Sequence, residues 1–397
     1  MLIGIDASRA TIARRTGTET YSRNLIRALI GLGSGHRFRL YTNGAAQVPG
    51  TGDLRSLEVP GTLIANVEIR SIPFPRLWTH VRLSAEMLMH PPDVLFVPAH
   101  VLPLIHPRRS VVTVHDLGYL HYPEAHRAAD RHYLDWSTRW NGRQATAVLA
   151  DSQATKDDLV RAYGVDPGRV HVVYLGRDEA FGPVRDVNRL AQTRDRYGVS
   201  GRYLLYVGTL QPRKNLARVI DAFARLTGDP ALAPTLPDMQ LVLAGKRGWL
   251  YDDLFAQVTR LGLASRVLFP GYIEEGDLPA LLSGALALVF PSLYEGFGIP
   301  VLEAGACGVP VITSNTSSLP EVAGDPSAGS GQAAALLVDP HDVDAIADAM
   351  FRIATDAELR AELDRRGQEN VMRFSWEKCA RETLAVLEEA TKRGRSG

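Results

Sequence analysis

The sequence predicts an α/β protein made of two doubly wound units, each with a parallel β-sheet that helices cover on both faces. Short apolar runs alternate with helical patterns along most of the 397 residues, and this alternation is typical of such sheets. The length is sufficient for two or three domains. Residues 175–201 contain four glycines and no strand pattern, so we expect the connection between the units there.

Seven strands are expected in the first half of the chain and six in the second. The first set comprises residues 2–6, 38–42, 67–72, 93–97, 111–115, 147–150 and 170–174. The second set comprises residues 203–207, 240–244, 267–269, 285–290, 309–313 and 335–338. Ligands of doubly wound sheets bind at the carboxyl ends of the strands. We therefore expect a site in a cleft where such ends face each other.

Composition narrows the class of protein. The 44 basic residues balance the 44 acidic ones, so no net field favours nucleic acid. Residues 1–185 hold 22 Lys and Arg against 17 Asp and Glu, and the remainder holds 22 against 27, which directs an anionic partner weakly to the first half. Two cysteines, Cys307 and Cys379, form no disulfide framework. The N-terminus resembles no signal peptide, and we expect a cytoplasmic protein.

The most informative stretch follows the strand expected at 285–290. Gly296 and Gly298 would let the backbone approach a ligand closely, and Pro300 suits the first turn of a helix. Free N–H groups at a helix start bind anions such as a nucleotide phosphate. Glu295 and Glu303 could face one ligand, with a ribose diol suited to Glu303. The alternative is a helix-capping glutamate and a solvated surface glutamate.

Arg213 and Lys214 follow another expected strand, 203–207, through a turn at 208–212. Two cations at the carboxyl end of a strand can neutralise the charge that develops on a departing diphosphate. The alternative is a pair of solvated cations at the start of a helix.

His115 and Asp116 end the strand expected at 111–115. They would lie at the carboxyl edge that faces the cleft, and the alternative for His115 is a histidine with a purely structural role.

The histidines are clustered in the sequence. Eight of the eleven lie between His80 and His132, but their spacing matches no zinc motif and no cysteine accompanies them. We therefore expect no metal site.

With these motifs the sequence resembles the retaining GT-B glycosyltransferases of family 4. Their signature is two glutamates separated by seven residues, here Glu295-GFGIPVL-Glu303. The segment Tyr206-VGTLQPRKN-Leu216 resembles the phosphate-binding turn of the family, and FPSLYEGFG at 290–298 is a close match. Many relatives carry an arginine directly after the glycine equivalent to Gly208, where this chain has Thr209, and Arg213 could supply that charge.

The resemblance implies two Rossmann-like domains that face a cleft. Residues 1–180 would bind the acceptor and 181–374 the nucleotide sugar, with the last helix, 375–397, returning to the first domain. Catalytic roles fall to His115, Arg213, Lys214 and Glu295. Donor contacts fall to Gly208, Arg213, Lys214, Gly296, Phe297, Gly298 and Glu303. Acceptor-side positions are Gly17 and Asp116.

The resemblance also implies the reaction. We expect retaining, metal-independent transfer of a hexose from a nucleotide diphosphate sugar, first of all GDP-mannose, to a glycan or lipid-linked acceptor, with no cofactor. The alternatives are a GT-B nucleotide-sugar epimerase and a noncatalytic two-domain sugar-binding protein. A nicotinamide oxidoreductase is disfavoured because no G-x-G-x-x-G follows either leading strand.

The N-terminal domain could also make a peripheral contact with the inner face of the membrane. Residues 77–89, LWTHVRLSAEMLM, suit either an amphipathic helix that touches a membrane or a helix of the core, and the core helix is the expectation.

Overall fold

The computed structural model describes residues 1–12, 17–44, 66–99, 101–232, 235–246, 248, 252–325 and 333–393. The chain divides into two compact units. Unit 1 comprises Met1–Gly176 and Phe374–Gly397, and unit 2 comprises Arg177–Arg373. Among the described helices we find none with the length and apolar character that a bilayer crossing requires.

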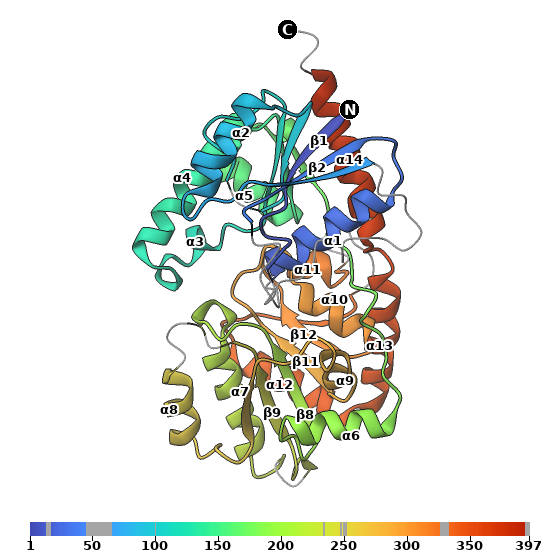
Figure 1. Ribbon diagram of the computed structural model, residues 1–397. Coiled ribbons are helices and arrows are strands. Elements are labelled where there is room, and N and C mark those ends of the chain that lie inside the picture. The colour runs from blue at the N-terminus through green and yellow to red at the C-terminus, as the bar shows by residue number, and fades with distance from the viewer. Residues whose placement is uncertain are drawn as a thin grey trace. The chain divides into compact units, whose positions relative to one another are not determined.

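Unit 1 contains a seven-stranded parallel sheet (Figure 1). Its strands are β1 (Leu2–Asp6), β2 (Arg37–Thr42), β3 (Val67–Ser71), β4 (Val94–Val97), β5 (Ser110–Val114), β6 (Ala147–Ala150) and β7 (Val170–Val172). Their order is β3-β2-β1-β4-β5-β6-β7. The chain therefore crosses from β1 outward to one edge, returns, and builds the other edge from β4, so the switch point lies between β1 and β4.

Helices cover both faces of this sheet, as Figure 1 shows for α1 and α14 on one side and α2 and α4 on the other. The elements are α1 (Gly17–Gly31), the π-helix η4 (Trp78–Leu83), α2 (Ser84–Met89), α3 (Gly118–His121), α4 (Ala128–Gln144), α5 (Gln153–Tyr163) and α14 (Trp376–Arg393). Two 3₁₀ turns lie at Pro123–Ala125 and Pro167–Arg169. The C-terminal helix α14 packs on α1, β4, β5 and β6.

Unit 2 repeats this arrangement with six parallel strands. The strands are β8 (Tyr203–Val207), β9 (Gln240–Ala244), β10 (Val267–Gly271), β11 (Ala287–Phe290), β12 (Val311–Ser314) and β13 (Leu336–Val338). Their order is β10-β9-β8-β11-β12-β13, which places the switch point between β8 and β11. Both sheets thus confirm the expected pair of doubly wound α/β units.

Eight helices and one 3₁₀ turn, Pro212–Lys214, are described in unit 2. The helices are α6 (Val187–Arg196), α7 (Leu216–Gly228), α8 (Asp252–Arg260), α9 (Leu278–Ser283), α10 (Ile299–Ala306), α11 (Leu319–Val322), α12 (Val343–Thr355) and α13 (Ala357–Val371). The expected connection at 175–201 contains α6, which packs on α9. Most of that segment therefore belongs to unit 2, because its apolar side chains find a partner helix there.

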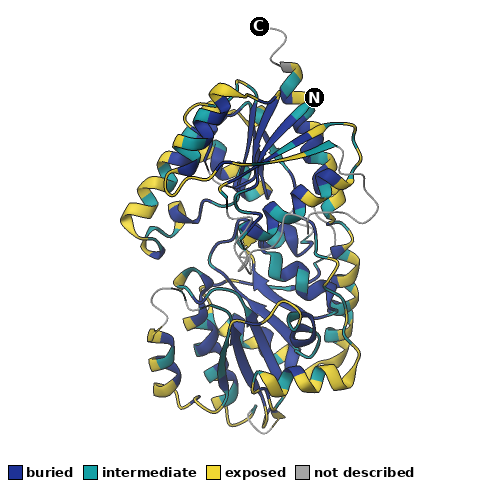
Figure 2. Cartoon of the chain, in the orientation of Figure 1, coloured by how far each residue is buried: buried dark blue, intermediate teal, exposed yellow. Residues whose placement is uncertain are grey.

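The central strands are buried on both faces, as the dark strands of Figure 2 show. β4 and β11 contain no exposed residue. Continuous burial explains why these strands are runs of Val, Leu, Ala and Phe without polar alternation. The rigid strands hold the loops at their carboxyl ends in place.

Candidate functional site

The carboxyl ends of β8 and β11 are neighbours in unit 2, because these two strands pair in parallel. The loop after β8 begins with Gly208 at φ 151°. A Cβ on Gly245, at the end of β9, would lie 1.8 Å from the Gly208 carbonyl oxygen. The close approach of these two backbones therefore requires glycine at 245. This contact lies at the carboxyl edge of the sheet, next to the switch point between β8 and β11.

Asn215 joins the loop after β8 to the loop after β11. Its backbone is left-handed, with φ 63°, and its side-chain Nδ2 donates to the carbonyl oxygens of Pro291 at 3.0 Å and Pro340 at 2.6 Å. Asparagine tolerates this conformation better than most residues. The anchored turn directs Arg213 and Lys214 toward the segment after β11. Sequence reasoning did not single out Asn215.

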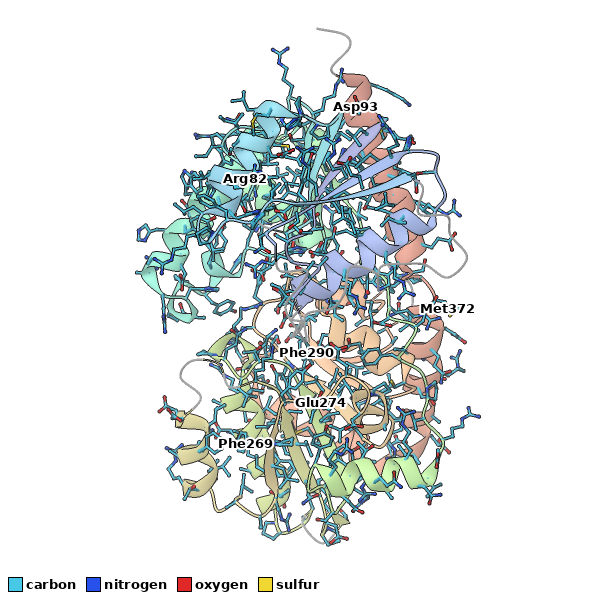
Figure 3. All side chains as sticks on the ribbon, viewed as in Figure 1. Arg82, Asp93, Phe269, Glu274, Phe290 and Met372 are labelled. Carbon is cyan, nitrogen blue, oxygen red and sulfur yellow. The ribbon has the colours of Figure 1, made fainter. Side chains whose placement is uncertain are left out.

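Arg213, Lys214 and Glu295 form a buried charged cluster. Lys214 Nζ donates to Glu295 Oε1, and Arg213 Nη1 lies 3.5 Å from Glu295 Oε2. Lys214 also lies over the ring of Phe290, 5.2 Å from its centroid; Phe290 is labelled in Figure 3. Burial alone would raise the pKa of Glu295, but the charges of Lys214 and Arg213 outweigh it and hold that pKa below its ordinary value. The cluster thus contains two cations and one carboxylate.

The loop after β11 turns into α10 through Gly296, Phe297 and Gly298. Gly298 has φ 107°, and a Cβ there would lie 2.7 Å from Leu319. Ser318 Oγ donates to the carbonyl oxygens of Glu295 and Phe297. The expected strand, glycine loop and helix with Pro300 in its first turn are all present. At the start of α10, Pro300 has no N–H and Val301 N donates to the carbonyl oxygen of Gly298 at 2.9 Å, so the N–H groups that could receive an anion are those that precede Pro300.

Glu303 differs from Glu295 although both are glutamates of the same motif. It lies on α10 and is partly exposed, and its side chain makes no hydrogen bond or ion pair with any described residue. Burial and the charges of Asp178 and Glu275 raise the pKa of Glu303 to about 8. Without a ligand the side chain is therefore mostly protonated at neutral pH, which leaves its oxygens available to hydroxyl groups.

In unit 1, His115 lies directly after β5 and both of its ring nitrogens are engaged. Nδ1 is 2.6 Å from Asp151 Oδ2, and Nε2 is 2.9 Å from the carbonyl oxygen of Pro98. Burial would lower the pKa of His115, but the carboxylate of Asp151 raises it. A carbonyl oxygen only accepts hydrogen bonds, so Nε2 carries a proton. The ring is held in place and joins the ends of β4, β5 and β6.

The two acceptor-side residues occupy ordinary turn and helix-start positions. Asp116 Oδ1 accepts from Gly118 N at 3.0 Å and so begins α3, and Gly17 is the first residue of α1. Sequence reasoning missed Asp6 at the end of β1, which is 2% exposed. Its Oδ1 accepts from Ser8 N, its Oδ2 has no hydrogen-bond partner among the residues that the structure describes, and burial raises its pKa to about 6. The signal in the sequence was an acidic residue at the carboxyl end of the first expected strand, a position where a functional carboxyl group is common.

Several other histidine and acidic side chains form pairs or cap helices, so they are engaged in local structure. His121 pairs with Asp158 at 2.7 Å. In the Asp-x-Asp triplet at 342–344, Asp342 caps α12 and Asp344 pairs with Arg225. Within the described ranges, His, Cys, Asp and Glu side chains form no group of three or more that could hold a metal ion.

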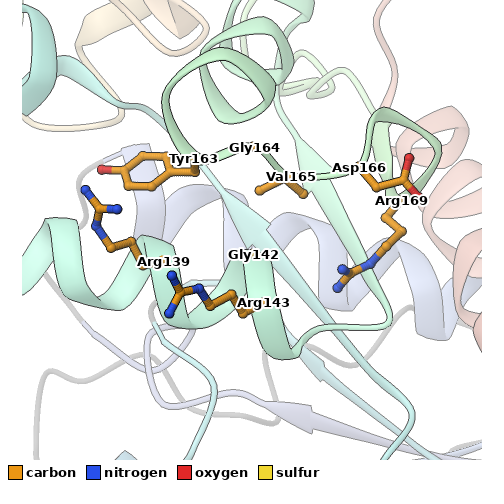
Figure 4. A pocket seen from close by; sticks show the side chains of 8 residues that line it. All are labelled: Arg139, Gly142, Arg143, Tyr163, Gly164, Val165, Asp166 and Arg169. Atoms are coloured by element: carbon orange, nitrogen blue, oxygen red, sulfur yellow. The ribbon is translucent and has the colours of Figure 1, made fainter.

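A cavity of about 290 Å³ lies elsewhere in unit 1, where α4 and α5 end (Figure 4). Arg139, Arg143, Tyr163 and Arg169 line it, and Arg139 stacks on Tyr163 at 5.0 Å. The helices α4 and α5 lead from this end into the starts of β6 and β7, so the cavity lies at the amino edge of the sheet. It is therefore separate from the carboxyl edge that holds His115.

Two family models match most of the chain. "Glycosyltransferase Family 4" matches residues 15–181, and "Glycosyl transferases group 1" matches residues 196–370. O-antigen chain mannosyltransferase B of Escherichia coli is 33% identical over 277 residues, which are 70% of this chain and 69% of that protein. D-inositol 3-phosphate glycosyltransferase of Salinispora tropica is 34% identical over 64% of this chain and 53% of that protein.

Solved structures resemble the whole chain. Anabaena Alr3699/HepE in complex with UDP and glucose has a TM-score of 0.71 and 20% identity, and the match covers 98% of this chain and 99% of that one. WaaG, a glycosyltransferase involved in lipopolysaccharide biosynthesis, has a TM-score of 0.68 and 18% identity with full coverage of both chains. These similarities confirm the GT-B fold.

Proposed function

Because this chain belongs to glycosyltransferase family 4, we propose that it transfers a mannosyl residue from GDP-mannose to a glycan or lipid-linked acceptor, with retention of the anomeric configuration. Glycosyl transfer itself follows from the family. The choice of mannose is supported by the similarity to O-antigen chain mannosyltransferase B. The choice of GDP as the nucleotide rests on the resemblance to family 4 alone.

The observation that carries the proposal is the buried cluster of Arg213, Lys214 and Glu295. Glycosyl transfer from a nucleotide sugar builds negative charge on the departing diphosphate. Two cations at the carboxyl edge of unit 2 can stabilise that charge as it develops. They are in position before the reaction begins, because Glu295 already holds Lys214. In the low-dielectric interior such preorganised charges are more effective than they would be in water.

The neighbouring residues supply binding. The backbone N–H groups near Gly296, Phe297 and Gly298 would contact the phosphates, and Gly208 would leave room for them. Glu303 would hold the ribose diol. A diol that donates to both oxygens of Glu303 favours the carboxylate form, so binding of the nucleotide would lower the raised pKa of this side chain.

Independence of metal is supported by this assignment of charges, and retention is supported by the resemblance to family 4. Lys214 and Arg213 would neutralise the leaving group without a divalent ion. The acceptor hydroxyl would attack from the face that the diphosphate leaves, and the departing phosphate oxygen would take its proton. His115 would position the sugar through its fixed ring and main chain without acting as a nucleophile. Gly17 and Asp116 would lie on the acceptor side.

A thermal-shift screen tests the donor. Each nucleotide sugar, with UDP, GDP, dTDP or ADP as the nucleotide, is added to the wild type and to Glu303→Ala. A ligand at 100 times its Kd stabilises by about 2.7 kcal/mol. GDP-mannose should raise the melting temperature of the wild type most, and Glu303→Ala should lose most of the shift. A larger shift with another base would replace GDP-mannose, and no shift with any nucleotide sugar would overturn the proposal.

A further inference from the structure

Two serines connect the loop after β11 to the start of α11. We call residues 295–298 the glycine loop, and Ser317 and Ser318 the serine pair. Glu295 N donates to Ser317 Oγ at 3.1 Å, and Ser318 Oγ lies 3.0 Å from the carbonyl oxygen of Glu295 and 2.8 Å from that of Phe297. Helices α10 and α11, which follow the glycine loop and the serine pair, contact each other (Figure 1). The serine pair therefore holds the backbone of the glycine loop at several points.

Ser318 does not cap its own helix. It occupies the N-cap position of α11, where a serine side chain usually accepts from a backbone N–H of that helix, but it makes no such bond with the described residues of α11. The residue is 0% exposed, and its one hydroxyl proton is shared between the two carbonyl oxygens of the glycine loop. The Ser318 hydroxyl therefore stabilises the glycine loop and not α11.

The bonds to Ser318 fix the direction of two peptide groups. In a trans peptide the C=O and the N–H of the next residue point in opposite directions, and the described peptide bonds are trans. The carbonyl oxygens of Glu295 and Phe297 point toward Ser318, so the N–H groups of Gly296 and Gly298 point away from it. These N–H groups belong to those that the proposed function assigns to the phosphates. Ser318 thus sets the face of the loop on which they lie.

Ser317 holds the glycine loop at an energetic cost. Its backbone is left-handed, with φ 56°, and a residue with a Cβ is strained there. Three of the described residues other than glycine have a positive φ. Two of them adjoin the charged cluster, because Asn215 directly follows Lys214 and Ser317 accepts from the N–H of Glu295. Strain of this kind persists only where surrounding contacts impose it, and it often marks a functional segment.

We propose that Ser317 and Ser318 are positioning residues for glycosyl transfer. Ser317 fixes the backbone of Glu295, whose carboxylate holds Lys214. Ser318 directs the N–H groups of the glycine loop toward the nucleotide sugar. Both serines act through the glycine loop and not on the substrate. The inference rests on the proposed function, which assigns donor binding to this loop, but it does not depend on the choice of GDP-mannose.

Ser318→Ala is the first test, with Ser314→Ala as its matched control. Ser314 is also 0% exposed, and its Oγ donates to the carbonyl oxygen of Ser292 at 2.6 Å, outside the glycine loop. Both variants should melt below the wild type by similar amounts, because each loses the bonds of one buried hydroxyl. Only Ser318→Ala should lose affinity for the nucleotide sugar, by at least about tenfold. Equal affinities of the two variants would overturn the proposal.

Two measurements keep this test separate from the identity of the donor. Calorimetry uses GDP-mannose and UDP-glucose, and the variants are compared with whichever of the two the wild type binds more tightly. Preference of the wild type for UDP-glucose would contradict the proposed donor and leave the comparison of variants intact. Hydrogen exchange of the glycine-loop amides, followed by mass spectrometry without ligand, should be faster in Ser318→Ala than in Ser314→Ala. Equal exchange in these two variants would refute the assignment of Ser318, whatever the donor.

Ser317→Gly separates positioning from stability. Glycine adopts the left-handed conformation without strain, which offsets the lost hydrogen bond, so the melting temperature should stay within about 3 °C of the wild type. Donor affinity should nonetheless fall at least about fivefold, because the N–H of Glu295 loses its acceptor. Leu77→Gly is the matched control, since it relieves a left-handed backbone, φ 54°, in unit 1, and it should bind the donor as the wild type does. Wild-type affinity in Ser317→Gly would show that Ser317 does not position the loop.

Discussion

The two sheets share one strand order, yet their switch-point edges have opposite charge. In unit 2, the edge between β8 and β11 has two cations, Arg213 and Lys214, around one carboxylate, Glu295. In unit 1, the basic groups described at this edge are His115 and Arg9, and each is paired with a carboxylate, Asp151 or Glu19. Asp6 and Asp116 add carboxyl groups at the ends of β1 and β5. The fold supplies the edge, and a few side chains decide its charge.

This difference in charge indicates which of the two edges can bind a diphosphate. An anion gains from the excess positive charge at the edge between β8 and β11 and would be repelled by the carboxyl groups at the corresponding edge of unit 1. Carboxyl groups suit hydroxyl donors, which is what a sugar acceptor offers. We therefore expect substitutions at the two edges to have separable effects, on the leaving group in unit 2 and on stability or the acceptor in unit 1.

Lys214→Met should have the largest effect. Removal of one preorganised charge from the leaving-group site should lower kcat/KM by roughly 10²–10³-fold, or about 2.7–4 kcal/mol. Steady-state kinetics with the preferred donor measures this. Lys378→Met, a substitution of an exposed lysine on α14, is the control and should change little. Turnover of Lys214→Met close to that of the wild type would mean that the diphosphate binds elsewhere.

The same substitution leaves Glu295 with one cation fewer, so stability must be separated from catalysis. Breaking a buried ion pair from one side typically destabilises by about 3–5 kcal/mol. The double variant Lys214→Met, Glu295→Gln removes both charges of the pair and should regain much of that stability, as measured by denaturant unfolding, while it remains inactive. Recovery of activity together with stability would show that the cluster is only structural.

Asp151→Asn tests the edge of unit 1. The buried ring of His115 would lose a charged acceptor, and the free energy of unfolding should fall by about 2–3 kcal/mol. Affinity for the nucleoside diphosphate, measured by calorimetry, should stay within twofold of the wild type. A large loss of nucleotide affinity in the folded variant would remove the distinction between the two edges.

Glu303→Ala probes donor binding at unit 2 without touching the cations. Loss of the two hydrogen bonds that the ribose hydroxyls donate to the Glu303 carboxylate should weaken nucleotide affinity by about 2 kcal/mol, or roughly 30-fold. Isothermal calorimetry is the measurement, with Glu358→Ala as the control because Glu358 is exposed on α13. If affinity is unchanged, the ribose is bound by another group.

The smallest effect concerns the pH dependence of stability. The pKa of Glu303 is raised from its ordinary value, 4.5, to about 8, so the folded state holds a proton that the unfolded chain releases. Stability therefore falls as pH rises through this range. Glu303→Gln cannot ionise and should gain about 1–2 kcal/mol relative to the wild type between pH 5 and pH 9, a figure reduced because the side chain is partly exposed.

Denaturant unfolding at both pH values measures this gain. Glu295→Gln should behave oppositely, because the lowered pKa of Glu295 means that its ionised form stabilises the folded state above the ordinary pKa. A stability difference for Glu303→Gln that does not vary with pH would show that the Glu303 carboxyl is not protonated in the folded state.

Sequence reasoning predicted the parts of the fold that depend on local pattern. The strands at 2–6, 147–150, 203–207 and 240–244 have the expected bounds, because each is a short apolar run between polar segments. The strand expected at 285–290 begins only at Ala287, since Ala285 N donates to the carbonyl oxygen of Leu282 and completes the turn after α9. The segment expected as a core helix at 77–89 forms η4 and α2, and Trp78, Leu83 and Met87 lie in the core of unit 1. Its other face is exposed at Leu77, Val81, Leu88 and Met89, because an apolar pattern does not say which side chains are covered.

Parts of the candidate site were less predictable. Arg213, Lys214 and Glu295 could be identified from their motifs, and the structure brings the three side chains together. Asn215 and Asp151 could not, because their hydrogen bonds join residues 76, 125 and 36 positions apart. The different charge states of Glu295 and Glu303 also depend on burial and on neighbours that only the folded chain supplies.

The proposed reaction is tested most directly by proton NMR of the first-formed glycosidic bond, with the donor from the thermal-shift screen and a matching acceptor, in the presence and absence of EDTA. The account predicts that the product keeps the anomeric configuration of the donor, at a rate that EDTA does not change, and that Lys214→Met forms it at least 100-fold more slowly. An inverted product, or a rate that EDTA abolishes and a divalent ion restores, would contradict it.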